Sequence, residues 1–410
     1  MKSISRLAVA AVLAAVTISA PAVAQKKAPA AAAGPKLSKP VQSLLAQAQT
    51  AQTAGDHLGA LTLLNQAIAV PKATAEDKLW TYRLMLNSAQ ATKDNALLKT
   101  SIEGALSTGM VTPADEIKFR TALRGLALQA KDYQGAIQQA TRMVALTPTD
   151  AKLQYELSGV YQLANQQKPA YEAASKAIAT AQAAGAVPEE YYKTAAKLAL
   201  DNNMSAEFAT TSAGWLDSYP TPENWRTILT LFRDSAKFDD QGSLDVFRLM
   251  HVTGSLASEK DYYEYAETAN QRGYPGEAKL IIDEGLAKGK LSTAKAYTKE
   301  LQAVVNPKVA RDKSSLAGLE GEAKKSANGK LALSTGDAYL GHGNFAKAVE
   351  MYQLALQKGA DPATANTRLG IALGKAGQKA EAEAAFKAVT GGGPRQQLAE
   401  YWLIWLGRQA

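Results

Sequence analysis

Small and bulky apolar residues recur at fixed offsets along this chain, and each clear set begins with a glycine. The two clearest sets read Gly343, Ala348, Tyr352, Ala355 and Gly377, Ala382, Phe386, Val389. An alanine follows the glycine after five residues, a bulky residue after nine and a smaller one after twelve. Gaps of three and four residues place side chains on one face of a helix. The pattern therefore predicts a turn at the glycine, followed by a helix with one buried stripe.

The same template recurs elsewhere, and the two clearest sets lie 34 residues apart. Four further sets are Gly55, Ala60, Leu64, Ala67; Lys131, Ala136, Ala140, Met143; Asn165, Ala170, Ala174, Ala177; and Gly273, Ala278, Ile282, Gly285. A period of about 34 residues is typical of a helix-turn-helix repeat. Gly336 and Gly370 precede the clearest turns by seven residues. Because glycine disfavours a helix interior, we expect a neighbouring helix to approach closely there.

This pattern resembles the tetratricopeptide repeat family, with its strongest match at residues 329–391. Tyr161 and Tyr339 take the aromatic place on the first helix of their pairs, whereas the family's signature tryptophan is absent from the good copies. The resemblance implies an all-α fold in which helix-turn-helix repeats stack as an α-solenoid, a tetratricopeptide-like superhelix. Its concave face would be lined by the first helix of each pair.

The match varies along the chain and predicts its organisation. After a leader, we expect tetratricopeptide-like repeats at 41–187, irregular helical repeats at 188–328, tetratricopeptide repeats at 329–391 and a capping helix at 395–410. Whether the irregular centre divides the solenoid stays open. Prolines are expected in the turns, at Pro71, Pro113, Pro148, Pro188, Pro220, Pro275, Pro307 and Pro362.

The first residues have the pattern of an export signal. Lys2 and Arg6 precede an apolar run from Leu7 to Ala20, and Ala22-Val23-Ala24 forms a small-residue cleavage site. Residues 1–24 are therefore expected to be a cleaved signal peptide, and 25–40 a flexible leader rich in Pro, Ala and Lys. The chain contains no cysteine, so that an exported protein would rely on its core alone. We expect a periplasmic protein without stable membrane insertion.

Charge adds little to this picture. The net charge of +8 falls to +6 when Lys2 and Arg6 leave with the signal, which contains no acid. Export makes nucleic acid an unsuitable partner. A weak association with the anionic cell envelope is the remaining role for the excess of cations.

Catalytic and metal-binding motifs are missing from the sequence. His57, His251 and His342 lie far apart, and neither a paired histidine spacing nor a G-x-S-x-G element accompanies them. We therefore expect no enzyme, no cofactor and no metal. The function that the resemblance implies is a scaffold that binds a protein or peptide in its concave groove, as an adaptor or assembly factor. The groove positions of the family map to Lys118, Lys152, Tyr155, Gln162, Lys330, Asp337, Thr364 and Thr367.

An alternative function rests on the leader and the aromatic residues. Ten aromatic side chains fall between residues 215 and 274. They either fill gaps between irregular repeats or form a contact surface. In the second case, together with the basic leader, they would make a protein that binds cell-envelope glycan or lipid headgroups.

The export signal makes a direct prediction. The mature protein is expected to begin at Gln25, because the cleavage site directly precedes it. N-terminal sequencing of protein isolated from the periplasmic fraction tests this. A chain that still begins at Met1 and stays with the membrane fraction would contradict it.

Overall fold

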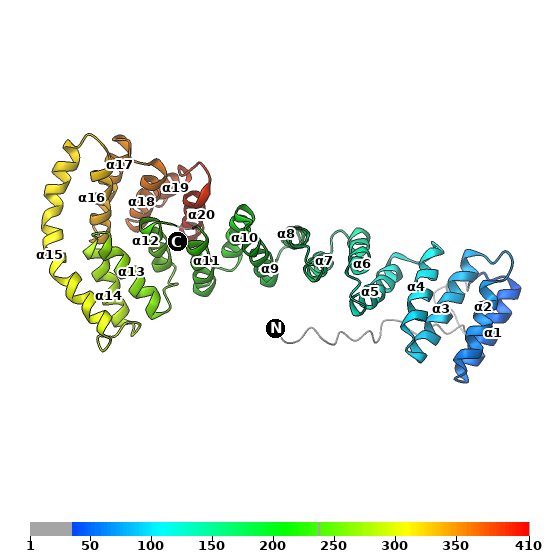
Figure 1. The fold of residues 1–410 in the computed structure, drawn as a ribbon. Coiled ribbons are helices and arrows are strands. Elements are labelled where there is room, and N and C mark those ends of the chain that lie inside the picture. Colours follow the sequence, from blue (N-terminus) through cyan, green and yellow to red (C-terminus); the bar gives the residue numbers. More distant parts are fainter. Residues whose placement is uncertain (1–34, 237, 410) are drawn as a thin grey trace, which may run out of the picture. The chain divides into compact units, whose positions relative to one another are not determined.

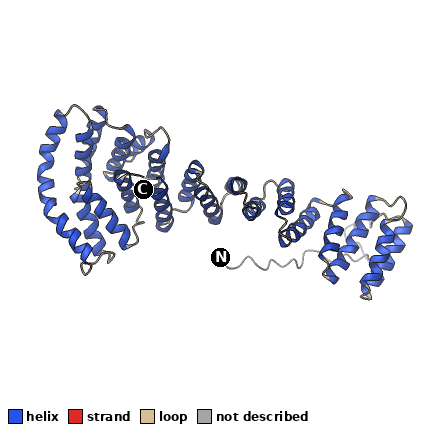
Figure 2. Ribbon diagram, viewed as in Figure 1, coloured by secondary structure: helices blue, strands red, loops and turns tan. Residues whose placement is uncertain are grey.

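The computed structural model describes residues 35–236 and 238–409. The predicted signal peptide, and the leader as far as residue 34, lie outside these residues. Within them every regular element is an α-helix, and the rest are turns and loops (Figure 2). The all-α fold class expected from the repeats is thus confirmed. The first helix begins at Lys39, inside the segment predicted as leader.

The chain divides into two compact units, which we describe separately and call unit 1, up to Asn202, and unit 2, from Asn203 onward (Figure 1). The division falls inside the segment predicted as irregular repeats. Unit 1 contains α1 Lys39–Thr53, α2 His57–Ile68, α3 Ala75–Thr92, α4 Asn95–Ser107, α5 Pro113–Gln129, α6 Tyr133–Leu146, α7 Ala151–Leu163, α8 Gln167–Ala183 and α9 Glu189–Asp201. Its helices pack as successive pairs, from α1 with α2 to α7 with α8.

Unit 2 continues with less uniform helices. They are α10 Ser205–Ser218, α11 Pro222–Ala236, α12 Asp240–Val252, α13 Glu259–Gln271, α14 Pro275–Ala287, α15 Ala296–Lys325, α16 Lys330–Gly341, α17 Phe345–Gln357, α18 Pro362–Lys375, α19 Lys379–Lys387 and α20 Gly393–Gly407. Here α13 packs with α14, α16 with α17, and α18 with α19. α16 to α19 thus form two packed helix pairs between Lys330 and Lys387.

The turns confirm the register of the repeats. The leading residue of all six sets has a positive φ, and Lys93 and Asn203 adopt the same backbone between α3 and α4 and between α9 and α10. Lys131 (φ 58°) and Asn165 (φ 57°) do so in the two sets without a turn glycine. Left-handed backbone costs a residue with a side chain about 1–2 kcal/mol. The turn geometry is thus kept even where the sequence offers no glycine.

The two helix glycines mark close approaches within a pair. A Cβ at Gly336 would lie 2.6 Å from Cε1 of Tyr352, and one at Gly370 would lie 2.6 Å from Cε1 of Phe386. Both rings are essentially buried, at 0% and 1% exposed. Each aromatic side chain of the second helix therefore occupies the space where a side chain of the first helix would stand.

One expected turn is absent. Pro307 lies inside α15, a single helix of 30 residues, and not in a loop between two helices. Proline removes one backbone hydrogen bond, to the carbonyl four residues earlier. Both Pro307 and Ala303 are exposed. Water can hydrate the freed carbonyl there, which explains why the helix continues through the proline.

The last helix, α20, covers more than the end of the final pair. Trp402 is fully buried and stacks on Phe386 of α19, with ring centroids 5.7 Å apart. On its other side α20 meets α10, where the Tyr401 and Ser212 hydroxyl oxygens lie 2.6 Å apart. It also contacts α12. The C-terminal helix therefore joins the end of unit 2 to its beginning.

The packing predicts the effect of larger side chains at the repeat alanines. Ala348 and Ala382 are fully buried. Replacing either with Leu should overpack the pair and lower the free energy of unfolding by about 1–3 kcal/mol. Urea unfolding measures this, with Ala346→Leu on the exposed side of α17 as the control. If both buried variants were as stable as the control, the repeat register would be wrong.

Candidate functional site

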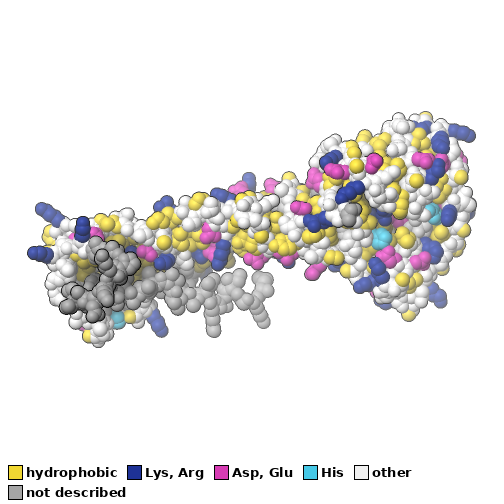
Figure 3. Space-filling view, turned by 180° about the vertical axis from the view of Figure 1, so that it is seen from behind, with side chains coloured by type: hydrophobic (Ala, Val, Ile, Leu, Met, Phe, Trp, Pro, Cys, Tyr) yellow, Lys and Arg dark blue, Asp and Glu magenta, His cyan; other side chains and the backbone are white. Residues whose placement is uncertain are grey.

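The surface charges are mixed in sign. On the face that Figure 3 shows, Lys and Arg side chains stand among Asp and Glu side chains and do not gather into one basic patch. Many of them form exposed pairs one helical turn apart, such as Lys279 with Asp283 at 2.8 Å. Pairs of this kind contribute little to stability. The candidate site therefore has to be found from the helix faces and not from bulk charge.

In unit 1 the first helices of successive pairs are linked by side chains. The links are Arg83 of α3 to Asp115 of α5 at 2.9 Å, Arg124 of α5 to Glu156 of α7 at 2.7 Å, and the Tyr155 hydroxyl of α7 to Thr194 of α9 at 2.8 Å. Two predicted groove residues take part in them, Tyr155 directly and Lys118 through its contact with Asp115. The spacing of these helices is thus set by polar contacts as well as by the core.

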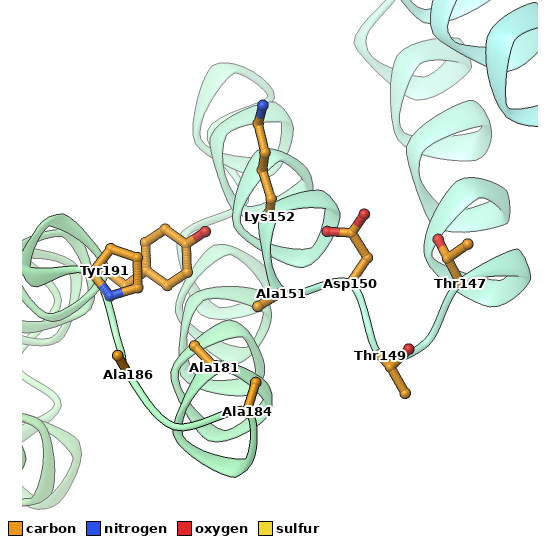
Figure 4. Close-up of a pocket in the computed structure, with 10 residues that line it drawn as sticks. Thr147, Thr149, Asp150, Ala151, Lys152, Ala181, Ala184, Ala186 and Tyr191 are labelled. Atoms are coloured by element: carbon orange, nitrogen blue, oxygen red, sulfur yellow. The ribbon is translucent and has the colours of Figure 1, made fainter.

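A hollow of about 620 Å³ opens beside this face, at the start of α7 (Figure 4). Its lining is formed by the loop before α7, the end of α8 and the start of α9. The apolar part is Ala151, Ala181, Ala184, Ala186, Pro188 and Tyr191, and the polar part is Thr147, Thr149, Asp150 and Lys152. The lining of the hollow is therefore mostly apolar, with its polar groups near the start of α7.

The start of α7 positions the charged groups of the hollow. The Asp150 carboxylate accepts the backbone N–H of Leu153 at 3.1 Å and so caps the helix. Lys152 follows in the first helical turn and is exposed. A cation there gains nothing from the helix dipole, which favours anions at this end. Within the described residues Lys152 has no ion-pair partner, so its ammonium group is available.

Tyr191 is the aromatic side chain that lines the hollow, and it packs against Tyr155. Their rings stack at a centroid distance of 4.2 Å, and Tyr191 is only 5% exposed. Burial raises the pKa of Tyr191, and the nearby carboxylate of Glu190 adds to the effect. The phenol therefore stays neutral. Tyr155, predicted as a groove residue, is half-buried, and much of its ring serves packing between α7 and α9.

The other predicted residues of unit 1 lie on the surface. Lys118 is exposed and reaches Asp115 at 3.2 Å. Gln162 is exposed near the end of α7. Their role in binding stays a prediction. Neither of them lines the hollow, whose lining includes Lys152 alone of the predicted residues.

Two predicted residues of unit 2 do not lie on an open surface. Asp337 and Thr367 are both fully buried, whereas Lys330 is exposed and Thr364 half-buried. The Thr367 hydroxyl donates to the carbonyl of Ala363 within its own helix, at 2.7 Å. The assignment of Asp337 and Thr367 to a groove is therefore corrected. The repeat pattern indicates on which face of a helix a residue lies. It does not show that further helices of unit 2 pack against that face.

Asp337 belongs to a buried network of ionic and phenolic groups. Its carboxylate accepts from Arg368 at 2.7 Å and from the hydroxyls of Tyr274 and Tyr352, each at 2.8 Å. Arg368 also donates to Asp245 of α12, at 3.2 Å. The network thereby joins residues 123 positions apart in the sequence.

A second arginine completes this network. Arg248 holds both carboxylate oxygens of Glu277, at 2.8 and 2.7 Å, and donates to Asp245 at 2.8 Å. Burial by itself would raise the pKa of Asp245, but Arg368, Arg395 and Arg248 outweigh it and hold that pKa well below its usual range. The carboxylate is therefore charged. Asp245 and Arg248 lie three residues apart in the stretch 244–250, which is otherwise apolar, and this spacing is a signal in the sequence that could have indicated a buried pair.

The aromatic side chains of residues 215–274 mostly fill the core. Seven of them are at most 5% exposed: Trp215, Trp225, Phe232, Phe247, Tyr262, Tyr265 and Tyr274. Tyr219, Phe238 and Tyr263 are half-buried. These rings pack between helices, so the first of the two interpretations holds for most of them.

The described residues contain little that resembles a reaction centre. His251 pairs with Glu284 at 2.6 Å and His342 with Asp312 at 2.7 Å, each with a single carboxylate. In the described ranges no group of three or more His, Asp or Glu side chains could hold a metal ion. No helix among them is long and apolar enough to cross a bilayer.

The fold and the turn register define the chain as an array of tetratricopeptide-like helix pairs. No protein-family profile and no curated protein matches the sequence. A tetratricopeptide repeat protein from Parabacteroides merdae is 12% identical, with 82% of this chain and 100% of that chain covered and a TM-score of 0.28. MamA from Desulfovibrio magneticus RS-1 is 15% identical, with 48% and 98% covered and a TM-score of 0.26. The apo form of RapI is 11% identical, with 78% and 97% covered and a TM-score of 0.27. Such low identities transfer no partner to this chain.

The network predicts a large effect from the loss of one arginine. Arg368→Met leaves Asp337 and Asp245 buried with fewer cations, and should lower the free energy of unfolding of unit 2 by about 3–5 kcal/mol. Urea unfolding followed by tryptophan fluorescence measures this, since four of the five tryptophans lie in unit 2. Lys279→Met, in an exposed pair, is the control and should cost at most about 1 kcal/mol. Equal costs for the two variants would contradict the role of the network.

Proposed function

We propose that this chain is a periplasmic repeat scaffold that binds other proteins or peptides, as an adaptor or assembly factor. The signal-like residues 1–24 support export, and the helix pairs support a role in presenting a surface. Affinity in such a scaffold comes from a few well-placed contacts along a rigid face. The proposed activity is binding and not catalysis.

The observation that carries the proposal is the face of the first helices in unit 1. Side-chain links hold α3, α5, α7 and α9 at fixed spacing, and Lys118, Lys152 and Gln162 remain exposed along α5 and α7. A preformed face of this kind loses little conformational freedom when a partner binds. The hollow at the start of α7 gives it a place where a partner's side chain can be enclosed.

The alternative, a protein that binds cell-envelope glycan or lipid headgroups, receives less support. It needs exposed aromatic rings, and seven of the ten rings in the centre are buried. Its other element is the basic leader, most of which lies outside the described residues. Export also leaves nucleic acid without support as a partner.

A pulldown from periplasmic extract tests the proposal. The immobilised protein should retain a defined protein at moderate salt, and Lys118→Glu on the first-helix face should reduce that retention. Lys168→Glu, which makes the same change on the second helix of a pair, is the matched control and should leave it unchanged. A chain that instead sediments with cell-wall or membrane material, and is released as salt rises, would overturn the proposal in favour of the envelope.

A further inference from the structure

α15 lies outside the regular succession of helix pairs in unit 2. The helices before and after it, α14 and α16, pack directly against each other, and α15 packs along both of them (Figure 1). The array of pairs therefore continues from α14 to α16 without passing through α15. With 30 residues α15 is also the longest helix of the described residues, whereas α14 has 13 and α16 has 12. A helix in this position can move without breaking the contact between its neighbours.

Few side chains attach α15 to the core. Five of its 30 residues are buried, whereas α16 buries eight of 12. The five are Thr298, Leu301, Val305, Leu316 and Ala323. The Thr298 hydroxyl oxygen has no hydrogen-bond partner among the described residues, which is unfavourable for a buried polar group. Because burial of apolar surface is the main contribution to packing, α15 is held less firmly than α16.

Partly exposed polar contacts add to the attachment of α15. They link it to α13, α16 and α17, and include Lys308 with Asn270 at 3.1 Å, Asp312 with His342 at 2.7 Å, Glu320 with Tyr339 at 3.0 Å and Glu320 with Lys347 at 3.2 Å. Ion pairs that water can reach contribute little to stability. These contacts therefore fix where α15 lies more than how firmly it is held.

The sequence of α15 favours the helix only weakly. Pro307 removes a backbone hydrogen bond near its centre. Gly318 and Gly321 interrupt its second half, and a Cβ at either position would meet nothing within 4 Å. They differ in this from Gly336 and Gly370, where an aromatic ring occupies the space. Because glycine is disfavoured in a helix interior, Gly318 and Gly321 weaken α15 without a gain in packing.

We propose that α15 is a strap that opens as one piece while α14 and α16 stay packed against each other. Weak attachment and low helix propensity both place α15 among the least stable parts of the fold, from which moving elements are drawn. Its opening uncovers the sides of α14 and α16 along which it packs. Unit 2 thus has a second arrangement, which exposes a further surface without unfolding the array.

Native-state hydrogen exchange of the full-length protein, followed by mass spectrometry of its peptides, tests the strap. The amides of α15 should have protection factors at least about tenfold lower than those of α14 and α16, on both sides of Pro307. Equal protection of the three helices would show that they open together and would overturn the proposal. Low protection on only one side of Pro307 would also overturn it, because α15 would then not open as one piece.

A change that strengthens the helix tests the cause of the opening. Gly318→Ala combined with Gly321→Ala should raise the protection of α15 by about tenfold and leave α14 and α16 unchanged. Gly159→Ala is the matched control, since its methyl group also enters open space, but in α7 of unit 1, and it should leave α15 unchanged. No gain in α15, or an equal gain in α14 and α16, would contradict a separate opening of α15.

A pair of charge variants tests the polar attachment. Glu320→Gln removes the charge that pairs with Lys347 and should lower the protection of α15 by about threefold. Glu322→Gln makes the same change at an exposed position of the same helix, where the carboxylate has no ion pair among the described residues, and should have no effect. Equal effects of the two variants would show that the contacts of Glu320 do not hold the strap.

Discussion

The close approach of the two helices within each pair is the contact on which the structure depends. It requires a residue without a side chain, or with a very small one, where the helices touch, as at Gly336 against Tyr352 and at the buried Ala348 and Ala382. Lys131 and Asn165 show how strong this constraint is, because they adopt a left-handed backbone that costs free energy. Packing of the pair therefore determines the turn, and the turn residue adapts to it.

Unit 2 adds a second constraint, which comes from its buried charged side chains. Ion pairs buried among helices are not in general more stable than apolar packing, but the loss of one partner is costly. Arg368 of α18 pairs with Asp245 of α12 and with Asp337 of α16, so this arginine has both of its carboxylate partners only when the three helices are assembled together. The contact between α20 and α10 acts in the same direction. The network thus selects one arrangement of the C-terminal helices.

The sequence predicted the contacts that lie within a single repeat and missed those between distant repeats. The small-residue template found the pairs because its members lie within one period of 34 residues. It gave no information on Arg368 with Asp245, or Tyr401 with Ser212, which are 123 and 189 residues apart. Pro307 was wrongly placed in a turn, since the sequence did not show that its position on α15 is exposed to water. Lys152 was predicted from its position in the repeat. The hollow beside it was not predicted, because the loops before α7 and α9 form much of its lining.

The corrected position of Asp337 shows why a repeat pattern predicts a scaffold more readily than a binding site. Asp337 and Lys152 were both assigned to the first-helix face, yet one is satisfied by an arginine and two tyrosines and the other lacks an ion-pair partner within the described residues. A charge that already has its partners in the fold gains little from a ligand, whereas an exposed charge without one gains a counter-ion. The helix face is the same for both residues, and the contacts made within the chain decide which of them is available to a partner.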